Sequence, residues 1–215
     1  MTNATNPIDA ALEGRRLLDH PFYRRWEAGQ LAPFELTGYA EQYRHFEAAL
    51  PSILQATISQ LDEGVARRAL QHNLDDEVAA PSHLELFDRF AAAYGARWMP
   101  PSPAMAALLA TYRAQVAAGP VQAVAGLAAY EVQGADVATS KAEGLATHYG
   151  ADRSALEFWE LHGTVEAHHG QSCREALDQF EATPEVVTAA AAAVASAWWG
   201  FLDEREALAA GALAG

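Results

Sequence analysis

The stretch LHGTVEAHHGQ, residues 161–171, carries two histidines and one glutamate at helical spacing. His162, Glu166 and His169 are four and three residues apart, so on an α-helix they fall within about 60° of one another. His168 falls on nearly the opposite side, and the apolar residue Phe158 adjoins the stripe. Helical bundles build metal sites from inward-facing carboxylates and imidazoles. The stretch therefore predicts metal ligands in a helical core, with a solvated polar face as the alternative.

The rest of the chain has the same helical period. Apolar residues recur at spacings of three and four, alanine is abundant, and proline and glycine separate long segments. We expect a first helix that includes Leu12, Leu17 and Leu18, and a bend at Pro51. Asp62 is expected to cap the fourth helix. The remaining expected helices span residues 21–28, 33–61, 62–80, 83–94, 104–118, 121–149 and 153–180, with a last one from 184 onward. No repeat or linker interrupts them, so residues 1–215 are expected to form one all-α domain.

Composition excludes several classes of partner. The chain has 215 residues, of which 51% are hydrophobic, and a formal net charge of −14. Such an acidic surface repels phosphate backbones and anionic lipid, so we expect neither a nucleic acid nor a membrane partner. No apolar run reaches the roughly 18 residues of a membrane span, and residues 1–9 do not resemble a signal peptide. Cys173 is the only cysteine, which favours a cytoplasmic protein without disulfides.

Two further segments contain candidate ligands. Glu131 lies in the middle of an apolar helix, where a lone carboxylate is rare unless it is paired or binds a metal. Glu77 and His83 are six residues apart, and the break at Pro81 allows both to face one site. Either segment alone is also compatible with a solvent-exposed surface. Together the segments supply three carboxylates and three histidines, a set typical of two iron or manganese ions, although zinc also accepts these ligand types.

Four stretches resemble a known family. They are HPFYRRWEAG at 20–29, YAEQY at 39–43, NLDDE at 73–77 with HLELF at 83–87, and YEVQGADVATSKAEGL at 130–145. Through them the chain resembles the haem-oxygenase-like di-iron oxidases, and among these the CADD-like branch. This resemblance implies a TenA/PqqC-like bundle of seven to nine helices that forms a homodimer. The implied metal ligands are Glu77, His83, Glu131, His162, Glu166 and His169.

The chain departs from the family pattern at two places. The family commonly has aspartate at the position of Glu166, which is longer by one methylene. The connection from Glu77 to His83 is also one residue shorter than usual, which makes Asp76 an alternative ligand to Glu77.

The resemblance also implies an activity. CADD-like proteins make para-aminobenzoate, a folate precursor, with O2 and an external reductant at an Fe/Fe or Fe/Mn pair. They use one of their own tyrosines as the ring and a lysine as the nitrogen source. The matching residues are Tyr23 and Lys141, with Tyr130 as a neighbouring redox-active tyrosine. The simpler interpretation is that Tyr23 is a core aromatic and Lys141 a surface charge.

Three other functions stay open. A di-iron oxygenase could share the metal site and act on a free small substrate such as a fatty or amino acid. A metal-free TenA/PqqC-like enzyme would need a nucleophile, for which Cys173 is the candidate. A binding protein without catalysis would not need six convergent ligands. The aromatic cluster of Trp198, Trp199 and Phe201 is expected to serve the core or a dimer interface.

Overall fold

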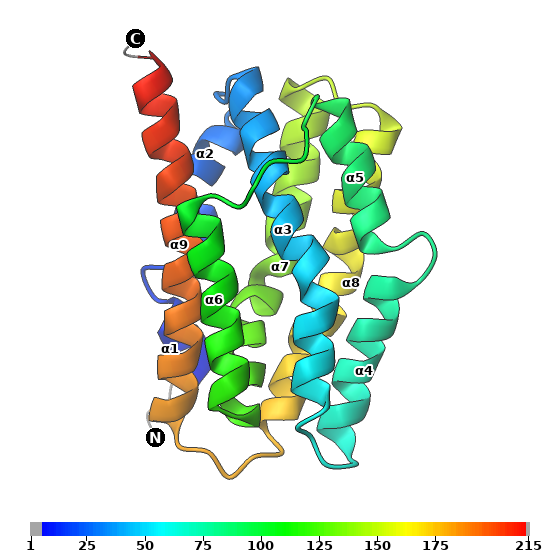
Figure 1. Cartoon of the computed structure of the whole chain (residues 1–215), viewed down its shortest axis with the longest axis vertical. Coiled ribbons are helices and arrows are strands. Elements are labelled where there is room, and N and C mark those ends of the chain that lie inside the picture. Colours follow the sequence, from blue (N-terminus) through cyan, green and yellow to red (C-terminus); the bar gives the residue numbers. More distant parts are fainter. Residues whose placement is uncertain (1–5, 214–215) are drawn as a thin grey trace.

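Residues 6–213, which the computed structural model describes except for the side chains of Glu166 and Leu213, form nine α-helices and one short 3₁₀ helix joined by turns and loops. Most of these helices run lengthwise beside one another in a bundle (Figure 1). The helices are α1 (Pro7–Leu12), α2 (Pro21–Glu27), α3 (Pro33–Ile58), α4 (Val65–Val78), α5 (His83–Ala93), α6 (Pro103–Ala118), α7 (Pro120–His148), α8 (Arg153–Leu177) and α9 (Pro184–Leu213), with the 3₁₀ helix at Leu17–Asp19. The all-α fold expected from the sequence is confirmed.

Proline and capping side chains set many of the helix starts. A proline stands in the first turn of α1, α2, α3, α6 and α7, where its fixed φ suits the helix and its missing N–H costs nothing. Asp152 caps α8 by accepting a hydrogen bond of 2.9 Å from the backbone N–H of Ala155. Inside α3 the helix continues through Pro51, so this proline does not end it.

Two expected helix boundaries are wrong. Leu17 and Leu18 do not extend the first helix, because α1 ends at Leu12 and Gly14 follows it with a φ of +68°. That left-handed conformation suits glycine and ends the helix. The fourth helix begins after Gly64 and is not capped by Asp62.

Helix α7 is the centre of the bundle. It contacts α1, α2, α3, α6, α8 and α9, and α7 and α8 pack along much of their length. Glycines on α8 allow this close approach, because a Cβ on Gly170 would lie only 2.8 Å from the carbonyl oxygen of Glu131. A Cβ on Gly163 would lie 2.9 Å from Thr139 Oγ1. The two long helices therefore meet nearly backbone to backbone beside Glu131.

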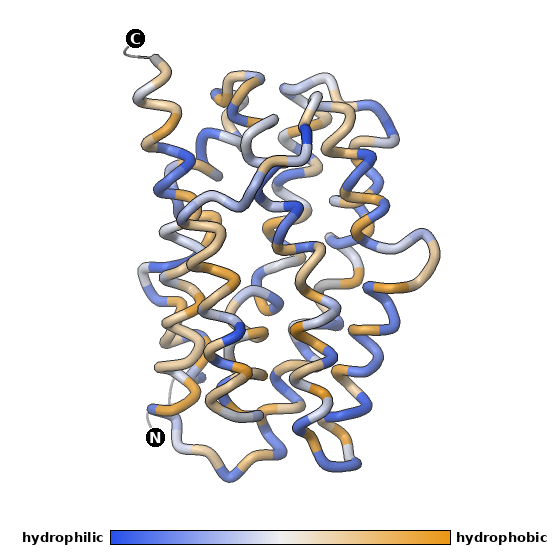
Figure 2. Tube along the Cα trace, in the orientation of Figure 1, coloured by the Kyte–Doolittle hydropathy of each residue, from blue (hydrophilic) through white to orange (hydrophobic). Residues whose placement is uncertain are grey.

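Helix α9 is long and apolar enough to cross a membrane by length and composition alone, and 44% of the relevant window is buried inside the protein. Figure 2 shows this helix mostly in hydrophobic colours, with one hydrophilic stretch toward its C-terminal end, at residues 203–206. Its buried residues Trp198 and Phe201 belong to the same hydrophobic core as the other helices. The sequence left open whether the aromatic cluster around Trp198 serves the core or a dimer interface. Trp198 belongs to the core.

The contact at Gly170 provides a test of the packing of α7 on α8. In Gly170→Ala the new methyl group would meet the α7 backbone, which cannot move aside as a flexible side chain can, so we expect a loss of about 1–3 kcal/mol. Gly200→Ala is the matched control, since nothing lies within 4 Å of its Cβ and alanine favours the helix by up to about 1 kcal/mol. Thermal unfolding followed by circular dichroism measures both. Equal stability of the two variants would contradict the proposed packing.

Candidate metal centre

Three buried side chains from three helices converge at one point. Glu77 lies near the end of α4, His83 begins α5, and His162 is on α8. Each offers a ligand atom, and these atoms lie within 4.8 Å of one another. The break between α4 and α5, which contains Pro81, turns Glu77 and His83 toward the same place, as the sequence led us to expect.

Hydrogen bonding orients His162 for metal binding. Its Nδ1 lies 2.8 Å from the carbonyl oxygen of Phe158. A carbonyl can only accept, so Nδ1 carries the proton and donates it, which leaves the lone pair on Nε2. The imidazole also packs against the ring of Phe158 at 3.9 Å and that of His83 at 4.4 Å between centroids. The ring is therefore fixed both in its tautomer and in its direction.

A second pair of candidate ligands comes from the contact between α7 and α8. His169 Nδ1 lies 3.7 Å from Glu131 Oε2, and both side chains are buried. The distance is too long for a hydrogen bond. It is instead typical of two atoms that bind one ion at about 2 Å each. The structure thus places Glu131 and His169 as a facing pair.

Unsatisfied polar atoms gather among these residues. In the described part of the chain, Glu47 Oε2, His83 Nδ1 and Glu131 Oε2 are buried without a hydrogen-bond partner. His83 Nδ1 is 3.0 Å from Glu77 Oε2, but the two groups are not aligned for a hydrogen bond. Buried polar atoms normally have partners, and a bound cation would satisfy carboxylate and imidazole lone pairs together. The residues present therefore fit a metal centre.

The protonation states of the metal-free site agree with this interpretation. Burial, followed by the charge of Glu131, raises the pKa of Glu77 to about 8. Burial lowers the pKa of His83, and lowers that of His162 well below its usual value. Imidazoles that stay neutral are the form that binds metal. The Glu77 carboxyl retains a proton that a bound cation would displace.

Glu47 on α3 is a member of the site that sequence reasoning missed. It is 3% exposed, and burial, followed by the charge of Glu77, raises its pKa to about 8. A hydrogen bond from Tyr43, one turn earlier on α3, partly offsets this rise. The available signal was a lone glutamate on the buried face that also carries Tyr39 and Phe46.

The expected Tyr23 and Lys141 lie together in the core. Lys141, the only lysine of the chain, is 1% exposed, so it is not a surface charge. Its Nζ lies 2.5 Å from the hydroxyl of Tyr39, which in turn lies 2.9 Å from the hydroxyl of Tyr23. The amine also lies 4.1–4.9 Å from the ring centroids of four aromatic residues, namely Tyr23, Tyr39, Tyr43 and Trp159.

The other expected tyrosine, Tyr130, is joined to the same group. Its hydroxyl lies 2.5 Å from that of Tyr43, and its ring stacks on Trp198 with centroids 4.8 Å apart. Tyr43 hydrogen-bonds Glu47 as well. A hydrogen-bonded line therefore runs from Tyr130 through Tyr43 to the carboxylate beside the candidate ligands.

The remaining predicted residues have different positions. The side chain of Glu166 lies outside the described part of the structure, although its backbone belongs to α8. Asp76 is not in the group formed by Glu77, and its carboxylate lies beside His169 instead. Cys173 is fully buried in the hydrophobic core, where a free cysteine packs as a small apolar side chain.

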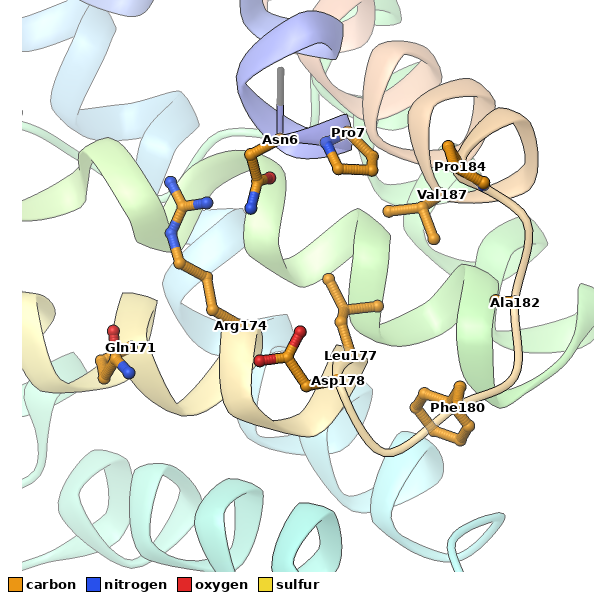
Figure 3. A pocket seen from close by; sticks show the side chains of 10 residues that line it. All are labelled: Asn6, Pro7, Gln171, Arg174, Leu177, Asp178, Phe180, Ala182, Pro184 and Val187. Carbon is orange, nitrogen blue, oxygen red and sulfur yellow. The ribbon is translucent and has the colours of Figure 1, made fainter. Parts of the chain in front are cut away.

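The hollow of about 420 Å³ in Figure 3 lies elsewhere in the bundle. It is enclosed by the first residues of α1 and α9 and by the end of α8, with Arg174, Leu177 and Val187 in its wall. A smaller hollow of about 240 Å³ shares Gln171 and Arg174 with it and reaches Glu131. Lys141 and the rings around it line neither of these two hollows.

Known proteins with established names align with nearly the whole chain. A 4-aminobenzoate synthase of Nitrosomonas europaea is 33% identical, with 91% of this chain and 88% of that protein covered. A 4-aminobenzoate synthase of Chlamydia muridarum is 30% identical, with 94% and 89% covered.

Solved structures share the fold at lower identity. A TenA homologue of Pseudomonas syringae superposes with a TM-score of 0.79 at 14% identity, covering 93% of this chain and 90% of that one. A CADD-like protein of unknown function from Nostoc punctiforme has a TM-score of 0.72 at 18% identity, covering 92% and 96%. The expected TenA-like, haem-oxygenase-like bundle is thereby confirmed.

The family comparison agrees with the donor set of the site. The model of a family described as iron-containing redox enzymes matches residues 37–201, which include all six ligands expected from the sequence. Because the match spans most of the chain, this protein belongs to that family of iron-containing redox enzymes.

Proposed function

We propose that this protein makes 4-aminobenzoate from its own residues, with Tyr23 as the source of the ring and Lys141 as the source of the nitrogen. The observation that carries the proposal is the position of the only lysine, fully buried against tyrosines and close enough to the candidate ligand His162 for its charge to act on that imidazole. The names of the two relatives above support the product. A lysine exposed on the surface would not have supported this proposal.

The geometry suits this chemistry. 4-Aminobenzoate carries its amino group on the ring position where tyrosine carries its hydroxyl. The Tyr39 hydroxyl lies between the Tyr23 hydroxyl and Lys141 Nζ, so the amine is held near that end of the Tyr23 ring. Burial raises the pKa of Tyr23, and the phenol therefore keeps its proton until it reacts.

The metal centre that we infer contains two ions, Fe/Fe or Fe/Mn. When bound, iron supplies the oxidising power, drawn from O2 with an external reductant. The residues that would hold the ions are Glu77, His83, Glu131, His162, His169 and, as the family resemblance implies, Glu166. The side chains around Lys141 exclude water, since Tyr23, Tyr43 and Trp159 are each 1% exposed. Oxidation of a free small substrate would instead need open space beside the metal centre, and a hollow of about 370 Å³ does border Trp159 and Gly163.

The metal content of the protein tests the proposed centre. Protein produced with added iron should contain about two iron, or iron and manganese, ions per chain. The double variant His162→Ala with Glu131→Ala should lose them because it removes one ligand from each group. His168→Ala is the control, since His168 is the exposed neighbour of His169. Elemental analysis gives the counts. Wild-type protein that holds no transition metal after anaerobic iron loading would contradict the proposal.

The stability of the metal-free protein should depend on pH through Glu77. The raised pKa of Glu77 means that the folded state favours the protonated carboxyl. This contribution is fully present below the unfolded pKa near 4.5 and is lost as the pH rises through about 8. Glu77→Gln removes this pH dependence of stability. Between about pH 5 and pH 9 the melting temperature of wild type should therefore fall relative to that of Glu77→Gln, by about 3 °C or more.

Asp75→Asn is the control for this pH series. Asp75 is an exposed carboxylate two residues before Glu77, and its substitution should leave the pH profile unchanged. A difference in melting temperature between wild type and Glu77→Gln that stays constant over the whole pH range would contradict a raised pKa of Glu77.

The origin of the product nitrogen can be traced with an isotope. Because Lys141 is the only lysine, protein made with ε-¹⁵N-lysine carries the label at this side chain alone. Anaerobically iron-loaded protein, exposed to O2 and a reductant, should release ¹⁵N-labelled 4-aminobenzoate, with no more than one molecule per chain. Tyr23→Phe and Lys141→Arg should yield no product while retaining metal. Tyr112→Phe, a buried tyrosine bonded to Trp198, should retain activity.

Mass spectrometry of the released product distinguishes the outcomes. Unlabelled product, or many turnovers per chain, would refute the use of Lys141. Turnover of an added small molecule by Tyr23→Phe would instead establish the free-substrate alternative.

A further inference from the structure

His169 has a different neighbour at each ring nitrogen. Nδ1 lies 3.7 Å from Glu131 Oε2 and so faces the candidate metal centre. Nε2 lies 3.2 Å from Asp76 Oδ2, on α4. The imidazole is 1% exposed, whereas the Asp76 side chain is 33% exposed. The ring therefore bridges the buried ligand group and a carboxylate at the edge of the core.

The chemistry of this contact fixes the tautomer. A metal ligand must be a neutral imidazole, which carries one proton on one of its two nitrogens. An ionised carboxylate only accepts hydrogen bonds, so Nε2–H donates to Asp76. The lone pair is then on Nδ1, the nitrogen directed at Glu131. Were Asp76 absent, the proton could move to Nδ1 and block the ligand position.

Helix α4 holds His169 at two points. Consecutive residues on a helix differ by about 100° in direction, so Asp76 reaches His169 while Glu77 joins His83 and His162. Three residues before Asp76, the buried Asn73 donates from Nδ2 to the His169 carbonyl oxygen at 3.5 Å. The ring and the backbone of His169 are thus both tied to α4.

We propose that Asp76 is a positioning residue, which holds His169 in the Nε2–H tautomer with Nδ1 aimed at the metal centre. The proposal relies on the proposed function only in that the site binds metal. Carboxylates that receive the second N–H of a ligating histidine fix the ring and raise its basicity, and their loss typically weakens metal binding about 10- to 100-fold. His72 is a weaker neighbour of Asp76, at 3.8 Å and largely exposed.

The first experiment needs no metal. In the metal-free protein, long-range ¹H–¹⁵N correlation spectra distinguish a protonated from a bare imidazole nitrogen, and His169→Gln assigns the signals. We expect a protonated Nε2 and a bare Nδ1 in wild type, and a mixture of tautomers in Asp76→Ala. Asp76→Glu retains an ionised carboxylate, which can only accept a hydrogen bond, so it should keep the wild-type tautomer. Asp75→Ala is the matched control, an adjacent exposed carboxylate bonded to Gln71.

The second experiment titrates each protein with Mn²⁺ and follows the free ion by electron paramagnetic resonance. Asp76→Ala should bind the same number of ions as wild type, but about 10- to 100-fold more weakly. Asp76→Glu, which retains the accepting carboxylate, should restore most of the affinity, and Asp75→Ala should match wild type.

The outcomes separate the two proposals. An unchanged tautomer and affinity in Asp76→Ala would overturn the positioning role, and loss of one ion at saturation would make Asp76 a ligand instead. If wild type binds neither Mn²⁺ nor iron, the proposed function fails, whereas the tautomer result still decides whether Asp76 orients His169.

Discussion

The cost of burying several carboxylates in one helical core is the constraint on which the rest of this structure depends. Glu47, Glu77 and Glu131 are each at most 3% exposed, and an unpaired buried charge is costly. Without a cation, the site reduces this cost by holding protons, which is why the pKa values of Glu47 and Glu77 rise to about 8. A pair of ions would remove the same cost by direct coordination. The core thus stores an electrostatic penalty that metal binding relieves.

The helices are arranged to bring these carboxylates together. Gly163 and Gly170 let α8 approach the backbone of α7, which places Glu131 opposite His169. The interruption between α4 and α5 turns Glu77 and His83 to one point. Neither arrangement is favoured by local helix propensity, since glycine in a helix costs up to about 1 kcal/mol. The glycines of α8 and the break between α4 and α5 are both explained if the geometry of the ligands, rather than helix stability, determines which residues stand there.

Most of the fold could be predicted because long amphipathic helices leave a strong pattern in the sequence. Boundaries failed where the signal was local: Asp62 is a good capping residue, yet α4 starts after Gly64. His162 and His169 were recognisable because both are on one helix at helical spacing. Glu47 was not, because it is a single residue whose partners lie on other helices, and only the folded chain shows that the apolar face around it meets Glu77. Asp76 could be seen only as an alternative ligand, since sequence does not show which side of His169 it contacts.

Lys141 differs from every other cation in the chain, because all the others are arginines. A buried positive charge alone would not require lysine, since the more weakly hydrated guanidinium is the usual choice for buried ion pairs. A primary amine differs in that it can lose its proton and act as a nucleophile. The hydroxyl of Tyr39, 2.5 Å from the amine, can accept that amine's hydrogen while it donates to Tyr23. A lysine here therefore provides what the proposed nitrogen donor needs, a primary amine with a hydrogen-bond acceptor beside it.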